Sequence, residues 1–159
     1  MSKAIYAGSF DPVTLGHMDI VERAAKLFDT LVIAVLENPN KKSLFTAEER
    51  KQQLQLVSRH IPNVEVACFQ GLLVDFAQEI GADVLVRGLR DTTDFTAEYQ
   101  RYLVNRRLGR ALETVFLAAD ERHICLSSTN VKEVAVFGGE IDFMVPAEIK
   151  PFVIEKYRK

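Results

Sequence analysis

The stretch KAIYAGSFDPVTLGHMDIVERAAKLFDTLVIAVL, residues 3–36, decides the fold. It begins with Lys3–Ala7, a short β-prone run before Gly8, and closes with Leu31–Leu36, a continuous apolar run typical of a strand covered on both faces. Between the two runs we expect a helix from about His17 to Phe28, because apolar residues recur there at helical spacing. The residues expected on its buried face are Ile20, Val21, Ala24, Leu27 and Phe28. This strand–helix–strand order predicts two parallel strands joined by a crossover helix.

The same alternation continues along the chain. Three more strands are expected, at Val64–Phe69, Asp83–Val86 and Thr114–Ala118. Further helices are expected from the Thr46–Glu49 capping-box pattern to about His60, over Leu72–Ile80 before Gly81, over about Asp94–Leu108 before Gly109, over Ser128–Phe137 before Gly138–Gly139, and from Pro146 onward. We therefore predict an α/β fold, a single doubly wound Rossmann-like domain of residues 1–159 with a five-stranded parallel sheet.

The composition of the 159 residues is that of a globular protein. Hydrophobic residues make up 48% and charged residues 26%, so disorder is not expected. The formal net charge of −2 provides no general basic surface, and we expect no nucleic-acid partner. Because no window approaches the ~20 apolar residues that span a bilayer, we expect no membrane partner and a cytoplasmic location. Cys68 and Cys125 lie in apolar surroundings, and we expect both as buried reduced thiols.

The loops beyond the carboxyl ends of the strands carry the functional prediction, because ligands bind there in sheets of this kind. The first loop, GSFDPVTLGH at residues 8–17, lacks the G-x-G-x-x-G pattern of dinucleotide-binding folds. It places Gly16 and His17 at a helix start, where free amides and the helix dipole favour a phosphate. The alternative is structural: Thr14 caps the helix, Gly16 relieves crowding and His17 lies on the surface.

Two further loops carry cations. Lys41 and Lys42 follow the second expected strand, although adjacent lysines are also typical of a solvated turn. Arg87 and Arg90 follow the fourth expected strand, and their planar guanidinium groups suit bidentate contact with phosphate. The alternative for these arginines is an internal salt bridge with a nearby carboxylate. The candidate partners are Asp91, Asp94 and Glu98.

The last loop carries three successive hydroxyl groups, on Ser127, Ser128 and Thr129. At a helix start such residues offer free amides and hydroxyl donors together, which suits a phosphate. The alternative is an N-cap, which any helix can use. An N-cap explains one of the hydroxyls but not all three.

These loops together resemble a known family. Residues 14–17, TLGH, resemble the [HT]-x-G-H first signature of the cytidylyltransferase-like nucleotidyltransferases. AGSFDPVTLGH is similar to the phosphopantetheine adenylyltransferase branch in particular, with Ala7 where a proline usually stands. The same branch has KK-x-x-F-T-x-E-E-R, as in residues 41–50, R-G-L-R followed by D-F and a glutamate, as in residues 87–98, and S-S-T-x-V-K-E, as in residues 127–133. Asn130 and His123 depart from its pattern, which commonly has an apolar and an aromatic residue at these positions.

The resemblance implies a reaction and a set of site residues. The reaction transfers the adenylyl group of ATP to 4'-phosphopantetheine, which gives dephospho-coenzyme A and pyrophosphate in coenzyme A biosynthesis. The implied catalytic residues are His17, Lys41 and Arg90. The implied ATP-binding residues are Ser9, Phe10, His17, Gly88, Leu89, Arg90, Glu98, His123, Ile124, Cys125, Leu126, Ser127, Ser128 and Thr129. The implied residues for the phosphopantetheine substrate are Ser9, Lys41, Leu73 and Arg87.

The implied partners are ATP, phosphopantetheine and further copies of the chain in a homohexamer. We expect Mg²⁺ to be bound to the ATP phosphates with few or no protein ligands. Attack in line on the α-phosphorus needs neither a general base nor a covalent intermediate, because the acceptor phosphate is already an anion near neutral pH. Three alternatives stay open: a related transferase acting on nicotinate mononucleotide or a sugar phosphate, a non-catalytic nucleotide-binding module, and a flavodoxin-like electron carrier.

Overall fold

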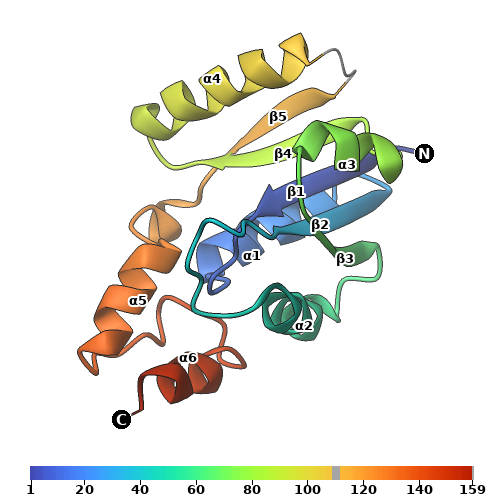
Figure 1. The fold of residues 1–159 in the computed structure, drawn as a ribbon. Coiled ribbons are helices and arrows are strands. Elements are labelled where there is room, and N and C mark those ends of the chain that lie inside the picture. The colour runs from blue at the N-terminus through green and yellow to red at the C-terminus, as the bar shows by residue number, and fades with distance from the viewer. Residues whose placement is uncertain (109–111, 159) are drawn as a thin grey trace.

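The computed structural model describes residues 1–108 and 112–158 (Figure 1). Its sheet has five parallel strands in the order β3-β2-β1-β4-β5. The strands are β1 (Lys3–Gly8), β2 (Thr30–Leu36), β3 (Val64–Phe69), β4 (Val84–Leu89) and β5 (Glu113–Ala118). The helices are α1 (Leu15–Ala25), α2 (Ala47–Ser58), α3 (Leu73–Glu79), α4 (Thr92–Arg107), α5 (Ser128–Val136) and α6 (Lys150–Tyr157), with a 3₁₀ turn at Glu121–His123. The predicted α/β class and five-stranded parallel sheet are confirmed, whereas the predicted helix end at Gly109 lies outside the described residues.

The order of the strands reverses at the centre of the sheet. From β1 the chain adds β2 and β3 on one side, and it then crosses over to add β4 and β5 on the other. Ala4 of β1 pairs in parallel register with Leu31 of β2 and with Val84 of β4. The carboxyl ends of β1 and β4 therefore flank the switch point at which ligands bind in open parallel sheets.

Helices cover both faces of the sheet (Figure 1). One apolar cluster packs alternate residues of β1 and β2, such as Tyr6 and Leu31, against α1, α2, α5 and α6. A second cluster packs the opposite face against α3 and includes Ile5 and Leu112. α4 covers this second face at β5, where Phe95 meets Phe116 edge to face with ring centroids 5.9 Å apart. The two clusters hold the switch point between two helical layers.

Local sequence determines several helix ends as predicted. Thr46 Oγ1 accepts a hydrogen bond from the N–H of Glu49 at 3.1 Å, and Glu49 Oε2 accepts one from the N–H of Thr46 at 2.7 Å. These two bonds complete the predicted capping box of α2. Gly81 follows α3 with a φ of +69°, in the left-handed region that favours glycine at a helix end.

Two predicted boundaries are wrong because contacts distant in sequence decide them. α1 ends at Ala25, and Leu27, expected on its buried face, is 60% exposed in the turn that leads to β2. β4 continues past the predicted end at Val86 as far as Leu89, because β5 pairs with it up to the Leu89–Ala118 pair. Arg87 and Gly88 consequently belong to a strand, not to the loop that follows it.

Two further predictions need correction. α6 begins at Lys150 with Pro151 in its first turn, while the carbonyl of Pro146 accepts hydrogen bonds from Ile149 and Lys150 in a preceding turn. Both cysteines are free, but Cys125 is exposed and Cys68 is half-buried, so the prediction of two buried thiols is wrong. Apolar neighbours in sequence did not ensure burial of Cys125, because it lies in the irregular segment before α5. Among the described residues, no helix is long and apolar enough to cross a membrane.

Candidate active site

The loop after β1 holds the imidazole of His17 in one orientation. Thr14 caps α1, because its Oγ1 accepts from the N–H of His17 at 3.2 Å. The N–H of Thr14 donates in turn to Nδ1 of His17 at 3.0 Å, so the imidazole completes a capping box. Because Nδ1 accepts this bond, the neutral ring carries its proton on Nε2. Thr14 therefore caps the helix, as the structural alternative for this loop predicted. The same cap also orients the imidazole of His17.

The surroundings of His17 keep its side chain neutral. Burial, together with the positive charge of Arg90, lowers the pKa of His17 from 6.5 to about 4. Phe10 packs against the imidazole edge to face, with ring centroids 5.0 Å apart. Within residues 1–108 and 112–158 no side chain or carbonyl accepts a hydrogen bond from Nε2. At neutral pH the Nε2–H group is thus a donor that remains available to a ligand in the part of the chain that the structure describes.

His17 lies in a cleft of about 390 Å³ at the switch point. The structure brings residues of the first, fourth and last loops together in this cleft, as the sequence suggested. Of the predicted ATP-binding residues, those that line it are His17, Gly88, Arg90, Glu98, His123, Leu126, Ser127 and Ser128.

Several lining residues were not assigned to a ligand from the sequence. They are Tyr6, Ile20, Asp94, Ala97, Arg101 and Ala119. Tyr6 and Ile20 follow the apolar periodicity of β1 and α1, which indicates core residues. In the structure they belong to the apolar core and also line the cleft. Asp94, Ala97 and Arg101 share with Glu98 one face of α4. Helical spacing from Glu98 could therefore have predicted that these three residues line the cleft.

The hydroxyl groups of Ser127 and Ser128 at the start of α5 make hydrogen bonds within the protein. Ser127 Oγ caps the helix by accepting from the N–H of Asn130 at 3.0 Å, and Ser128 Oγ donates to the carbonyl of Pro12 at 2.8 Å. The second bond ties α5 to the first loop. The N–H groups of Gly16, Ser128 and Thr129 have no hydrogen-bond partner among the described residues, as expected for first-turn amides. The structure therefore offers main-chain amides, rather than three hydroxyls, to an anion.

The two arginines of the fourth loop both pair with carboxylates. Arg90 donates from Nε to Asp94 at 2.8 Å, and Arg87 Nε lies 2.9 Å from Glu98 Oε2 while its Nη1 donates to the carbonyl of Ala7 at 2.8 Å. Burial lowers the pKa of Arg87, although Glu98 opposes this effect. The salt-bridge alternative is therefore present for both residues. Arg90 still lines the cleft, whereas Arg87 lies on the opposite face of the sheet, which it shares with Leu85.

Comparisons with known proteins agree with this geometry. The family model described as cytidylyltransferase-like matches residues 5–134. A phosphopantetheine adenylyltransferase of Clostridium kluyveri is 49% identical over all of this chain and 97% of its own length. Another from Heliobacterium modesticaldum is 50% identical over 99% of this chain and 94% of its own length.

This chain belongs to the phosphopantetheine adenylyltransferase family of cytidylyltransferase-like enzymes. The fold of the family extends to distant proteins. A crystal structure from Vibrio parahaemolyticus, provisionally assigned as a nicotinate-nucleotide adenylyltransferase, superposes with a TM-score of 0.75. It covers 100% of this chain and 97% of its own, with 18% sequence identity, and therefore shows the fold alone.

The remaining residues suggested by the family resemblance do not line the cleft. Lys41 is exposed in a turn in which its N–H donates to the carbonyl of Asn38 at 3.0 Å, and Ser9 is half-buried directly after β1. Leu73 begins α3 and packs, half-buried, on the second apolar cluster. Phe10 is buried under His17, and Leu89 ends β4 beside Ala118. The predicted ATP-binding residues that are exposed outside the cleft are Ile124, Cys125 and Thr129.

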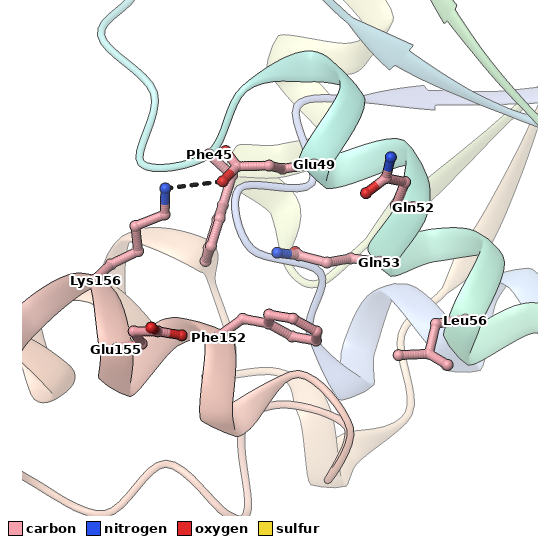
Figure 2. Close-up of a pocket in the computed structure, with 8 residues that line it drawn as sticks. All are labelled: Phe45, Glu49, Gln52, Gln53, Leu56, Phe152, Glu155 and Lys156. Atoms are coloured by element: carbon pink, nitrogen blue, oxygen red, sulfur yellow. Dashed lines mark hydrogen bonds and ion pairs between the residues drawn. The ribbon is translucent and has the colours of Figure 1, made fainter.

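A larger cavity of about 600 Å³ lies between α2 and α6 (Figure 2). Phe45 and Phe152 face it from opposite sides, and Lys156 spans its rim to Glu49 with a 2.9 Å hydrogen bond. Its walls are the sides of two helices, without free first-turn amides, and its acidic side chains disfavour a polyphosphate. In this family fold the cleft at the switch point is accordingly the better candidate for nucleotide binding.

The lowered pKa of His17 predicts a pH-dependent loss of stability. The unfolded chain binds a proton at this residue below about pH 6.5, but the folded chain binds one only below about pH 4. Stability should therefore fall as the pH drops from 8 to 5, with a contribution from His17 of about 2 kcal/mol. Urea denaturation of wild type and His17→Gln at both pH values measures it. Equal losses in the two proteins would show that His17 titrates normally.

Proposed function

We propose that this chain transfers the adenylyl group of ATP to 4'-phosphopantetheine and so produces dephospho-coenzyme A and pyrophosphate. The proposal depends chiefly on one convergence at the switch point. The Nε2–H of His17, the free amides of Gly16 and Ser128, and the guanidinium of Arg90 surround a single cleft. The curated relatives that match the whole chain are phosphopantetheine adenylyltransferases, which supports this acceptor.

The chemistry requires positioning more than proton transfer. An oxygen of the acceptor phosphate attacks the α-phosphorus of ATP, a new P–O bond forms, and the bond from the α-phosphorus to the bridging oxygen breaks. The electron pair leaves with pyrophosphate, and no proton has to move. Charge that develops on the α-phosphate would be stabilised by His17 Nε2–H and Lys41, while Arg90 and the start of α5 would hold the β- and γ-phosphates.

The acceptor would approach from the other side of the switch point. Ser9 and Lys41 follow β1 and β2, and Arg87 and Leu73 lie on the sheet face covered by α3 and α4. The nucleotide cleft opens between α1 and the start of α5 on the other face, and α4 supplies its remaining wall with Asp94, Ala97, Glu98 and Arg101. Two substrates held on opposite sides of the β1 and β4 ends would place the attacking oxygen in line with the leaving pyrophosphate. This division supports a transfer between two bound substrates.

Mg²⁺ would accompany ATP. No group of three or more His, Cys, Asp or Glu side chains suited to a metal occurs among the described residues. The carboxylates that line the cleft, Asp94 and Glu98, are each bonded to arginine. These residues fit a cation that is carried by the phosphates better than one held by a protein cage. When bound, Mg²⁺ neutralises phosphate charge, and the residues of the chain supply orientation.

The test is a pyrophosphate-release assay on the purified wild-type protein with ATP, Mg²⁺ and phosphopantetheine. We expect pyrophosphate and dephospho-coenzyme A in equal amounts, the latter identified by mass spectrometry. Nicotinate mononucleotide in place of the acceptor, and CTP in place of ATP, serve as controls and should give little product. ATP binding without pyrophosphate would indicate a non-catalytic module, and release with nicotinate mononucleotide alone would indicate a different acceptor.

We also propose that the chain assembles with copies of itself into the hexamer that the resemblance implies. α4 has no buried residue in the described chain and exposes apolar side chains on its surface. These are Phe95, Tyr99, Leu103 and Val104, and Leu108 at its C-cap is exposed beside them. An apolar surface of this kind is suited to burial between subunits.

A further inference from the structure

Arg50 is a buried cation that the proposed chemistry does not use. It lies on α2 and is only 3% exposed. Burial of a charged group is costly unless its donors are satisfied. Nη1 donates to the carbonyls of Ser9 at 2.7 Å and Leu36 at 3.1 Å, and Nε donates to those of Phe45 at 3.1 Å and Thr46 at 3.2 Å.

The four carbonyls belong to two loops on the acceptor side of the site, the loop after β1 and the loop between β2 and α2. Ser9 begins the loop after β1, and Leu36 ends β2 just before the turn that carries Lys41. Phe45 and Thr46 end that turn at the start of α2. A single guanidinium therefore holds both ends of the Lys41 loop and joins them to Ser9.

A buried carboxylate makes the complementary contacts. Asp11 is 4% exposed and accepts from the N–H groups of Leu44 at 2.8 Å and Phe45 at 2.9 Å. Its Oδ2 also lies 3.4 Å from Nζ of Lys132 on α5. Asp11 thus accepts hydrogen bonds from amides of the Lys41 loop, while Arg50 donates hydrogen bonds to carbonyls of the same loop.

We propose that Arg50, with Asp11, is a positioning residue that sets Ser9 and Lys41 for the acceptor phosphate. The proposal rests on the proposed function of the chain. The rigid fork of the guanidinium is essential, because donors on two nitrogens must reach carbonyls in three segments. None of the four carbonyl residues lines the nucleotide cleft. Loss of Arg50 should therefore change KM for phosphopantetheine and leave KM for ATP unchanged.

Arg50→Lys tests this selectivity, because it retains the charge and removes the fork. We expect kcat/KM for phosphopantetheine to fall by about 10- to 100-fold, the size caused by misplaced reacting groups, with an unchanged KM for ATP. Arg59→Lys is the matched control, since Arg59 is exposed at the end of the same helix, and it should behave as wild type. The assays are run well below the melting temperature of each variant, which circular dichroism determines.

A second variant keeps the test decisive if Arg50→Lys does not fold. Asp11→Asn removes one acceptor from the same loop and should give the same selective loss for phosphopantetheine. Equal rises in KM for the two substrates, or kinetics of wild type in a folded variant, would overturn the inference. A wild-type protein that releases no pyrophosphate would refute the proposed function instead, and ATP titration calorimetry would then show whether the nucleotide cleft is intact.

Discussion

Replacement of His17 by alanine should lower kcat by roughly 100- to 1000-fold, the cost of removing one donor aimed at charge that develops in a transition state. The structure gives the physical reason. Thr14 occupies Nδ1 at 3.0 Å, so Nε2–H is the donor, and the low pKa keeps the ring neutral at the pH of the assay. Steady-state kinetics with saturating ATP and phosphopantetheine measure the change, and ATP affinity should fall far less than kcat.

The control for this prediction is His60→Ala. His60 is exposed and its Nε2 lies 3.6 Å from Glu22, away from the cleft. It should turn over like wild type. If His17→Ala retained turnover within a factor of a few of wild type, His17 would be only a helix cap, and the assignment of a transition-state donor would be wrong.

Replacement of Lys41 by alanine should also lower kcat by roughly 100- to 1000-fold, because a cation beside the attacked phosphate acts where charge builds up. Lys41 is exposed and lies outside the nucleotide cleft, on the loop held by Arg50 and Asp11. It would contact both phosphates only when the two substrates are bound. The loss should therefore appear in kcat, with little change in ATP affinity measured by calorimetry.

Lys42→Ala provides a control one residue away. Both lysines are exposed on the same turn, so general effects of charge on the loop should be shared by the two variants. We expect Lys42→Ala to turn over close to wild type. Similar losses in both variants would show that the turn attracts anions only through its overall charge, and would remove Lys41 from the mechanism.

The family resemblance could be predicted because it resides in short contiguous signatures. The loop before His17 and the run from Ser127 can each be read directly in the sequence, and the fold brings the two segments to the same cleft. The chemistry within those signatures was less predictable. Three hydroxyls suggested three donors, but Ser127 caps α5 and Ser128 binds Pro12 across 116 positions in sequence, which leaves the amides for a ligand. Arg87 was expected in a loop, yet it lies in β4 and pairs with Glu98.

The sequence by itself determined the order of strands and helices, the capping box at Thr46, the turn at Gly81 and the family. These features depend on residues within a few positions of one another, where spacing and side-chain type act directly. Only the tertiary structure decided the length of β4, the exposure of Cys125, the partners of Arg87 and the role of Arg50. Strand pairing, burial and hydrogen bonds to distant carbonyls depend on segments that meet only after folding. The neutral state of His17 has both origins, since Thr14 orients the ring locally while burial and Arg90 lower its pKa.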